Sequence, residues 1–497
     1  MRFFFFLLLV LFSFSPKSQT LFYKEKFRPQ YHFTPPIHWT NDPNGLVYHN
    51  GKYHLFYQYN PFGIRWGHMS WGHAVSTDLV YWEHWPLAIP EEKDTMIFSG
   101  TCVVDSFNST GFAKQQGQIP LVAVYTAHVK DVGQSQHLAY SLDDGLTWEK
   151  YNKNPVLDIG STDFRDPQVF WYTPDKKWVM CVVLALEKKI QFYSSPDLKQ
   201  WKWMSDFGPA GDTTGIWECP DLFRAPIDGE SGKSKWVLMH SPAPYMQYFV
   251  GEFDGTTFHN ENPPQKIYRP DYGPDYYAAI AYKNLPAGSA PISIGWANNW
   301  NYAQDIPTNP WRSTMSLPRK LSVKKINGEW ILIQQPVAQF DKIKKMIYKD
   351  YKVGFEKVMK FPTPSSQQYE VDFSLSPGAG ATGGIRIGTG NGHYLEFGWD
   401  TKKNILYLDR SKTSNQTFSA EFSKMGRFEI PYIPGGPFEV QVYVDHSIAE
   451  FFVTGGERVF TAQFFPTEKD TGVELFSTST TAAGAGHCVV YEIKNTW

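Results

Sequence analysis

The sequence predicts an all-β protein, a five-bladed β-propeller followed by a C-terminal β-sandwich. Short apolar runs recur along the 497-residue chain between clusters of Gly, Pro, Asn and Asp, and helical periodicity is nearly absent. A degenerate repeat of propeller-blade length occupies the part of the chain before residue 330. After residue 336 this repeat ends, and alternating apolar and polar segments follow.

The N-terminal segment, residues 1–18, reads as a signal peptide. Arg2 precedes an apolar run from Phe3 to Phe12, and a small and polar stretch then ends near Ser18. The apolar core is too short to span a bilayer, and no later segment approaches a transmembrane length. We therefore expect an exported protein, secreted or periplasmic, without a membrane span.

Residues 19–335 are assigned to the propeller. Each copy of the repeat reads as a strand, a Ser/Asp turn and a Trp that opens the next strand. The three copies are Ala74–Trp82, Ala139–Trp148 and Phe192–Trp201. Their spacing, roughly 50 to 65 residues, suits a blade of four strands with generous loops. With a first blade near Asp42 and later ones near Phe249 and Ile294, about five blades fit before residue 330.

The chain changes character after the propeller. Residues 336–352 are assigned to a linker because this stretch is rich in lysine. Residues 353–497 are assigned to the β-sandwich. Within them Phe438–Val444 and Ile448–Val453 alternate in the way of strands with one buried face.

Charge and motif content argue against several function classes. A net charge of −2, from 47 basic and 49 acidic residues without long runs of one sign, gives no support for nucleic acid or an anionic membrane as partner. The four cysteines lie far apart without metal-type spacing, and Cys102, Cys181 and Cys488, which sit within apolar strand-like runs, read as buried free thiols. No His-Glu-x-x-His motif and no Gly-x-Ser-x-Gly elbow in an α/β pattern occurs. We expect neither a metal nor a cofactor.

Aromatic residues are unusually abundant, at 17% of the chain with 18 Trp. Many of them must pack the core. Trp and Tyr also present a flat apolar face with a polar edge, which suits stacking on sugar rings. Together with export and balanced charge, this composition favours a carbohydrate ligand.

Hydrolysis of a glycosidic bond needs two carboxyl groups on opposite sides of the anomeric carbon. Asp42 lies in Trp39–Gly45, where Asp-Pro and Asn-Gly both mark turns, so a stiff backbone holds its carboxylate. Asp166, in Arg165-Asp166-Pro167, also precedes a strand through a Pro. Taken alone, the first is most often a turn former and the second a surface pair. A propeller, however, brings such strand starts to one central funnel.

Glu218 is the third candidate, in Trp217-Glu218-Cys219-Pro220. This apolar setting disfavours an ionised carboxylate, which is what an acid catalyst at near-neutral pH requires. Asp221 competes for the role, but we expect it to be a turn or supporting residue.

Three motifs in this order, Trp-x-Asn-Asp-Pro-Asn-Gly, Arg-Asp-Pro and Trp-Glu-Cys-Pro, resemble glycoside hydrolase family 32, which includes invertases, levanases, inulinases and fructosyltransferases. The resemblance spans the mature chain and includes Val444–Phe452 as a sandwich signature. It implies a five-bladed propeller joined to a sandwich, and a retaining double displacement. By this resemblance Asp42 is the nucleophile at C2 of a fructofuranosyl unit, Glu218 is the acid and then the base, and Asp166 holds the fructosyl hydroxyls. Retention predicts carboxyl groups of Asp42 and Glu218 about 5–5.5 Å apart.

The resemblance also implies a set of contacts in the fructose pocket. These are Trp39, Asn41, Gln58, Trp66, Phe98, Ser99, Arg165, Asp275 and Trp296. We expect Trp300 and Trp311 to be packed propeller residues instead. Thr40 stands where the family often has Met, whereas its neighbours Trp39 and Asn41 are unchanged, which favours water over sugar as the acceptor.

The sequence thus predicts an exported retaining β-fructosidase that removes terminal fructose from a fructan, levan or inulin, with sucrose as a secondary substrate. The sequence of its first blade most resembles that of microbial exo-acting fructanases. Three alternatives stay open: an invertase, a fructosyltransferase and a non-catalytic fructan-binding protein. Linkage preference and oligomeric state are not determined.

Overall fold

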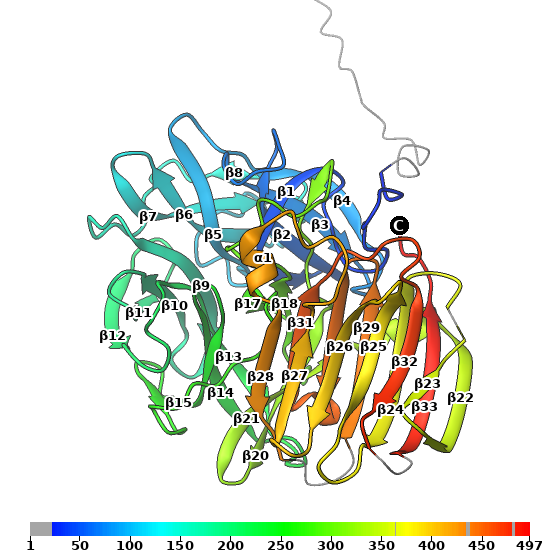
Figure 1. The fold of residues 1–497 in the computed structure, drawn as a ribbon. Helices are drawn as coiled ribbons and strands as arrows, with labels where there is room; N and C mark the ends of the chain where they lie inside the picture. Colours follow the sequence, from blue (N-terminus) through cyan, green and yellow to red (C-terminus); the bar gives the residue numbers. More distant parts are fainter. Residues whose placement is uncertain (1–21, 363, 434–437, 480–482) are drawn as a thin grey trace, which may run out of the picture.

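The computed structural model describes residues 22–362, 364–433, 438–479 and 483–497 (Figure 1). The predicted signal peptide, residues 1–18, lies outside the described residues. Within them the chain forms 33 strands, one α-helix, α1 (Ala420–Lys424), and three 3-10 helices. The predicted all-β class is confirmed. No helix in the described ranges is long and apolar enough to cross a membrane.

Five sheets, which we call blades, make up the first domain. The first blade contains β1 (His38–His49), β2 (Lys52–Asn60), β3 (Ser70–Ser76) and β4 (Glu83–Ile89). The second contains β5 (Thr95–Val104), β6 (Leu121–Val129), β7 (Gly133–Ser141) and β8 (Glu149–Lys150). The third contains β9 (Phe164–Tyr172), β10 (Lys177–Leu184), β11 (Lys189–Ser195) and β12 (Lys202–Phe207), with the 3-10 helix η1 (Thr173–Asp175) after β9. The fourth contains β13 (Trp217–Pro226), β14 (Ser234–Pro242), β15 (Gln247–Phe253) and β16 (Phe258–Asn260). The fifth contains β17 (Tyr277–Ala281), β18 (Ile292–Trp296), β20 (Arg319–Ile326) and β21 (Glu329–Pro336).

The first strands of the blades form a closed ring. β1 contacts β5, and the contacts continue through β9, β13 and β17 back to β1. β19 (Trp311–Arg312), which follows β18 in the chain, pairs parallel to β1 and so ties the last blade to the first. Five sheets arranged in this closed ring form a propeller.

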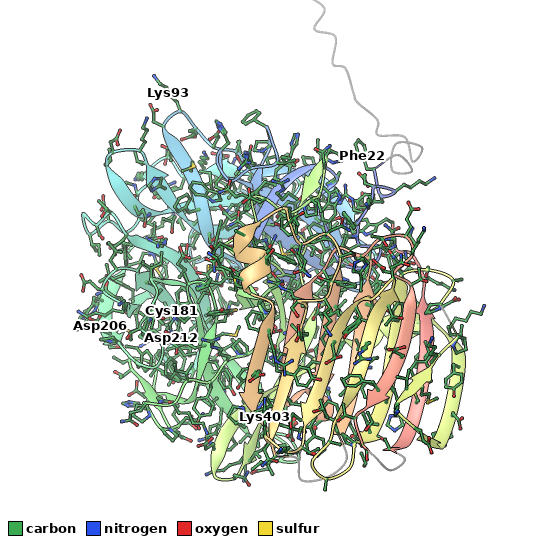
Figure 2. All side chains as sticks on the ribbon, in the orientation of Figure 1. Phe22, Lys93, Cys181, Asp206, Asp212 and Lys403 are labelled. Atoms are coloured by element: carbon green, nitrogen blue, oxygen red, sulfur yellow. The ribbon has the colours of Figure 1, made fainter. Side chains whose placement is uncertain are left out.

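Each blade buries both of its faces against its neighbours. On β5, Cys102 packs toward the first blade with Phe56, while the adjacent Val103 packs toward the third blade with Val182. Successive side chains of a strand point to opposite faces, so an apolar run without alternation is what a blade between two blades needs. Figure 2 shows side chains filling the interior of this domain, where the labelled Cys181 lies. All four cysteines are buried and free, as expected for three of them.

Two six-stranded sheets form the second domain, a β-sandwich beside the propeller (Figure 1). One sheet contains, in spatial order, β22 (Lys344–Phe355), β33 (Ala483–Ile493), β24 (Gln368–Ser376), β29 (Phe438–Asp445), β30 (Ile448–Val453) and β31 (Arg458–Gln463). The other contains β23 (Val358–Lys360), β32 (Gly472–Ser477), β25 (Thr382–Gly390), β26 (His393–Asp400), β27 (Ile405–Asp409) and β28 (Arg427–Pro431). Inward-facing residues of both sheets, among them Val371, Phe397 and Phe451, share one core.

The connection between the domains is shorter than the assigned linker. The 3-10 helix η2 (Ala338–Ile343) follows β21 directly, and a third, η3 (Thr454–Gly456), follows β30. Residues 344–352, which we assigned to the linker, lie in β22 and pair antiparallel with β33. β22 is an edge strand of its sheet. Lysines on an edge strand prevent it from pairing with other chains, and the same lysines make its sequence resemble a linker.

Charged side chains are buried where the two domains meet. Arg319 of the propeller donates to Glu450 of the sandwich over 2.7 Å, and both side chains are inaccessible to solvent. His32 lies between Asp445 and Glu450, at 2.9 and 3.1 Å. Burial lowers the pKa of His32, but the hydrogen bonds to these two carboxylates outweigh it and raise the pKa on balance. The domains are therefore joined by an ionic network as well as by apolar contacts.

Candidate active site

The inner strands of all five blades are irregular at the end nearest the predicted catalytic residues. In the pairing of β1 with β2, Thr40 lies opposite Tyr59 and Pro43 lies opposite Tyr57. The two residues between them, Asn41 and Asp42, therefore both face Gln58. The other interruptions lie between Ile97 and Gly100 in β5, Arg165 and Gln168 in β9, Glu218 and Asp221 in β13, and Tyr277 and Ile280 in β17. Two residues facing one form a β-bulge, which bends the strand and redirects its side chains. Five such bulges aim side chains at the propeller axis.

Three of these bulges hold a residue other than glycine in the left-handed region. Asp166 has φ 63°, Cys219 has φ 47° and Ala278 has φ 52°. Such a conformation costs on the order of 1 kcal/mol per residue and persists only where surrounding bonds enforce it. Here the Asp166 N–H donates to Thr126 Oγ1 over 2.9 Å, and the Cys219 N–H donates to Asp166 Oδ2 over 3.0 Å. The strain accompanies the placement of both residues beside the carboxylates.

Asp42 and Asp166 meet at the thiol of Cys219. Cys219 Sγ lies 3.6 Å from Asp42 Oδ2 and 3.6 Å from Asp166 Oδ2. Ser99 Oγ donates to Asp42 Oδ2 over 2.8 Å. Asp42 Oδ1 is buried without a hydrogen-bond partner among the described residues. One oxygen of Asp42 is thus held by donors, while the other has no donor among the described residues.

Glu218 lies across from these two carboxylates and is held by polar partners. Arg165 Nη2 donates to Glu218 Oε1 over 3.1 Å, and the Tyr277 hydroxyl donates to Oε2 over 2.5 Å. The expectation of an apolar setting is therefore wrong. Trp217, its neighbour in sequence, is fully buried and donates to the Asp212 carbonyl instead. Adjacent residues of a strand point to opposite faces, so sequence neighbours do not form the environment of Glu218.

Burial and mutual repulsion raise the pKa values of the two buried aspartates. Burial, followed by the charge of Glu218, raises the pKa of Asp42 to about 6. Burial raises the pKa of Asp166 to about 7, with Arg165 opposing the shift and Glu218 adding to it. Carboxyl groups this close titrate as one unit. The cluster therefore changes its charge between mildly acidic and neutral pH, which is where an acid-base catalyst works.

A cavity of about 330 Å³ opens over these groups. It is lined by nine residues predicted from the sequence, namely Asn41, Asp42, Gln58, Trp66, Phe98, Ser99, Arg165, Asp166 and Glu218. Trp300 and Gln304 complete the lining. This size and mixture of aromatic and polar walls are typical of a small-ligand site.

Three other predicted contact residues do not line this cavity. Trp39 lies beneath it, fully buried, and donates to Asn41 Oδ1 over 2.7 Å, which orients that amide. Trp296 is also fully buried and packs against Trp300 at 4.7 Å between ring centroids. Asp275 accepts hydrogen bonds from Tyr302 and from Arg410 of the sandwich, and thus belongs to the domain interface.

Four site residues were not predicted as such: Trp300, Gln304, Tyr277 and Cys219. Trp300 was expected to pack like Trp311, which is indeed buried, yet it lines the cavity. A signal for it was present, since Trp300 shares a short motif with Trp296, but the motif does not say which indole faces the ligand. Tyr277 follows the predicted Asp275 by two residues, and Cys219 stands within the Glu218 motif.

Sequence comparison places the chain in a family. Residues 32–336 match the family model "Glycosyl hydrolases family 32 N-terminal domain", and residues 340–492 match "Glycosyl hydrolases family 32 C terminal". The chain belongs to glycoside hydrolase family 32. It is therefore a glycoside hydrolase, and the resemblance drawn from its three motifs is confirmed.

Characterised relatives of this family 32 enzyme cover nearly its whole length. A levanase of Bacillus subtilis (strain 168) is 43% identical, over 99% of this chain and 74% of the levanase. An extracellular exo-inulinase of Aspergillus ficuum is 39% identical, over 96% of both chains.

Solved structures of the family share the fold. The crystal structure of exo-inulinase from Aspergillus awamori matches with a TM-score of 0.90 and 37% identity, over 96% of this chain and 100% of that one. The β-fructofuranosidase from Schwanniomyces occidentalis complexed with fructosyl-erythritol matches with a TM-score of 0.86 and 31% identity, over 95% and 98%. The predicted combination of propeller and sandwich is thus confirmed.

Proposed function

We propose that this family 32 enzyme is an exo-acting β-fructofuranosidase that releases terminal fructose from fructans, levan or inulin, and also cleaves sucrose. The convergence of Asp42, Asp166 and Glu218 at one cavity of about 330 Å³ carries the proposal. Similarity to the levanase and the exo-inulinase, at 43% and 39% identity, exceeds the 33% identity to an invertase of Schizosaccharomyces pombe. This order supports fructans as the main substrate.

The first half-reaction forms a covalent intermediate. Asp42, as a carboxylate, attacks C2 of the terminal fructosyl unit while the bond from C2 to the leaving oxygen breaks. Glu218 gives its proton to that oxygen, so that the rest of the fructan leaves as an alcohol.

The second half-reaction releases fructose. Glu218, now a carboxylate, takes a proton from water, whose oxygen attacks C2 and displaces Asp42. Two inversions at C2 retain its configuration. Arg165, 3.1 Å from Glu218 and 4.0 Å from Asp166, keeps the two carboxyl groups in place through both steps. Asp166 holds fructosyl hydroxyls, a grip that strengthens as charge develops on the sugar.

Incubation of the enzyme with sucrose, inulin and levan, followed by chromatography of early products, tests this function. We expect free fructose as the first product from each fructan. Long oligosaccharides would contradict the exo action, and kestose-type products at high sucrose would identify a fructosyltransferase. Binding of fructan without turnover, unchanged in Asp42→Ala, would identify a binding protein.

The role of Glu218 has its own test. Glu218→Gln cannot protonate the leaving oxygen, so we expect natural fructans to react about 100-fold more slowly or worse. An aryl fructoside with an activated leaving group needs no such proton and should lose far less in its first step. Equal losses on both substrates would exclude Glu218 as the acid.

We also propose that the enzyme is exported. The signal-peptide pattern of residues 1–18 supports this, as does similarity to an exo-inulinase described as extracellular. N-terminal sequencing of enzyme collected outside the cytoplasm should start just after Ser18. An intact Met1 in that fraction would refute cleavage.

A further inference from the structure

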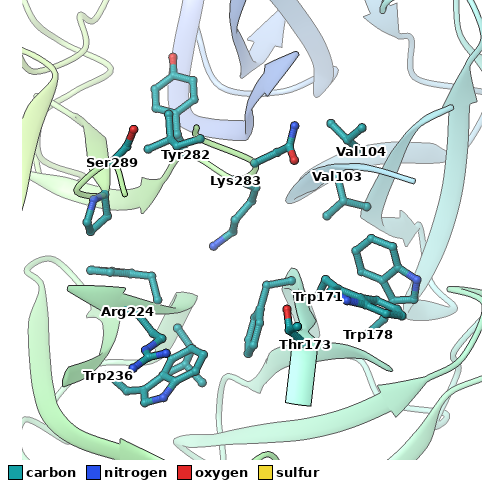
Figure 3. Close-up of a pocket in the computed structure, with 16 residues that line it drawn as sticks. Val103, Val104, Trp171, Thr173, Trp178, Arg224, Trp236, Tyr282, Lys283 and Ser289 are labelled. Atoms are coloured by element: carbon teal, nitrogen blue, oxygen red, sulfur yellow. The ribbon is translucent and has the colours of Figure 1, made fainter. Parts of the chain in front are cut away.

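A second cavity opens at the other end of the propeller from the catalytic carboxylates (Figure 3). Ser99 and Asp166 lie in the N-terminal halves of β5 and β9. The second cavity is lined by the C-terminal residues of the same strands, Val104 and Trp171 among them. Its volume is about 490 Å³, against about 330 Å³ for the catalytic cavity. It is therefore a separate space, which the proposed reaction does not use.

Aromatic side chains form much of its wall. Trp171 and Trp178 of the third blade meet edge to face at 5.1 Å, and Trp236 of the fourth blade stands across the opening from them (Figure 3). Trp178 and Trp236 are buried behind the cavity surface. The rings offer flat apolar surfaces against which the organic part of a ligand can pack.

Lys283 is a cation built into this cavity. Its side chain extends into the opening (Figure 3), yet only 9% of the residue is accessible to solvent. The ammonium donates to Asp221 Oδ1 over 2.5 Å, and the Lys283 N–H donates to the Leu46 carbonyl over 2.8 Å. An ammonium has three hydrogen-bond donors, so this geometry leaves donors for a ligand. The charge is therefore fixed in place before any ligand arrives.

Arg224 supplies a second cation without a counter-charge. Its guanidinium lies 5.8 Å from the Trp236 ring, and it has no carboxylate partner among the described residues. None of the 16 residues that line the cavity, all of them in the described ranges, is Asp or Glu. Among the described residues, Asp221 is the only carboxylate that forms an ion pair with either cation, through Lys283. The site thus carries a net positive charge.

We propose that this cavity binds a small oxyanion, a phosphate or carboxylate group, between Lys283 and Arg224, with the organic part of the ligand against Trp171 and Trp236. A guanidinium fits the paired oxygens of such a group, and an ammonium adds a point charge. A neutral sugar suits the site less, because the lining side chains offer cationic donors without a carboxylate acceptor for sugar hydroxyls.

Calorimetric titration with inorganic phosphate, at an ionic strength held constant with sodium chloride, tests the proposal. We expect saturable binding accompanied by a change in tryptophan fluorescence. Arg224→Gln, at an exposed position, and Lys283→Met should each weaken binding about tenfold or more. Lys235→Met is the matched control, since Lys235 is next to Trp236 in the chain but does not line the cavity, and pairs with Glu252 and Glu261; binding should be unchanged.

Further arms identify the ligand chemistry. Citrate in place of phosphate distinguishes a carboxylate from a phosphate site, and Asp42→Ala should bind either probe as the wild type does. The proposal is overturned if neither probe binds saturably, or if Arg224→Gln binds as tightly as the wild type. A neutral fructo-oligosaccharide that binds Asp42→Ala and is lost in Arg224→Gln would make the cavity a sugar site instead. None of these outcomes bears on fructan hydrolysis, which is tested by its products.

Discussion

Among single residues, Cys219 contacts two of the three catalytic carboxylates. Its main-chain N–H donates to Asp166, and its thiol lies within 3.6 Å of both Asp42 and Asp166. Burial raises the pKa of this thiol well above its ordinary value, with the neighbouring carboxylates adding to the shift. The thiol therefore stays protonated at neutral pH and acts as a hydrogen-bond donor, not as a nucleophile.

Cys219→Ala should shift the acid limb of the pH profile. Asp42 must be ionised to attack, so kcat/KM rises with pH through its pKa of about 6. Loss of the thiol donor removes a contact that favours ionised Asp42, so the pKa of Asp42 should rise. The acid limb of the profile should then lie at a pH higher by about half a unit. Cys219→Ser, which keeps a donor, is the control. An acid limb that stays in place in Cys219→Ala would contradict the role of the thiol.

Tyr277→Phe tests a positioning residue for the acid. The Tyr277 hydroxyl donates to Glu218 Oε2, and a hydrogen bond to a charged group contributes about 1.5–3 kcal/mol. We expect kcat on fructan to fall about 10- to 100-fold, with KM changed less. The activated aryl fructoside should react nearly normally in its first step. Equal losses on both substrates would point to a general structural defect.

Among the structural elements, the bulged inner strands decide where the side chains point. Gly100 closes the bulge of β5 that carries Phe98 and Ser99. A Cβ atom on Gly100 would lie 2.1 Å from the Val124 carbonyl oxygen on the paired strand β6. The backbone of β6 cannot move aside for a Cβ atom as a flexible side chain could, so only glycine fits at position 100.

Gly100→Ala should therefore lower both the stability of the fold and the activity, although it adds only one methyl group. We expect it to destabilise the fold by about 2 kcal/mol or more. It should also lower kcat/KM, because Ser99 would move away from Asp42. Gly63→Ala is the matched control, since its Cβ would meet nothing within 4 Å. Thermal unfolding and kinetics on sucrose would check this, and two variants that behave alike would disprove it.

In the molecule as a whole, buried ion pairs hold the sandwich against the propeller. Asp275, at the start of the fifth blade, and Arg410 of the sandwich are both inaccessible to solvent and 3.0 Å apart. Burial raises the pKa of Asp275, and the guanidinium of Arg410 opposes that shift. Because a buried charge needs its partner, the contact couples the stability of the two domains.

Arg410→Met should destabilise the protein by about 3–5 kcal/mol at neutral pH, since it leaves a buried carboxylate unpaired. The pKa of Asp275 then rises further, and its stability contribution is lost as pH rises through that value. The loss should therefore be smaller at pH 5 than at pH 8 in denaturant titrations. Arg427→Met, which removes an exposed pair with Asp409, should cost about 0–1 kcal/mol. A loss for Arg410→Met that is equal at both pH values would contradict this account.

The strand-rich fold, the order of the domains and the three carboxylates could all be predicted from the sequence. Turn residues such as Asp-Pro and Asn-Gly determine the local backbone, and a strand is recognised from the spacing of its own apolar residues. Both signals can therefore be found in the sequence without knowledge of distant contacts. This is why Asp42, Asp166 and Glu218 could be named within their motifs before any contact was known.

Which neighbouring residues belong to the site became clear from the three-dimensional contacts. Trp300, and not Trp296, lines the cavity, and Asp275 lies at the domain interface. Glu218 is contacted by Arg165 and Tyr277. These outcomes depend on bulges and on ring closure, which arise from pairing between strands far apart in the sequence. The direction of a side chain follows from that pairing, so no local pattern contains it.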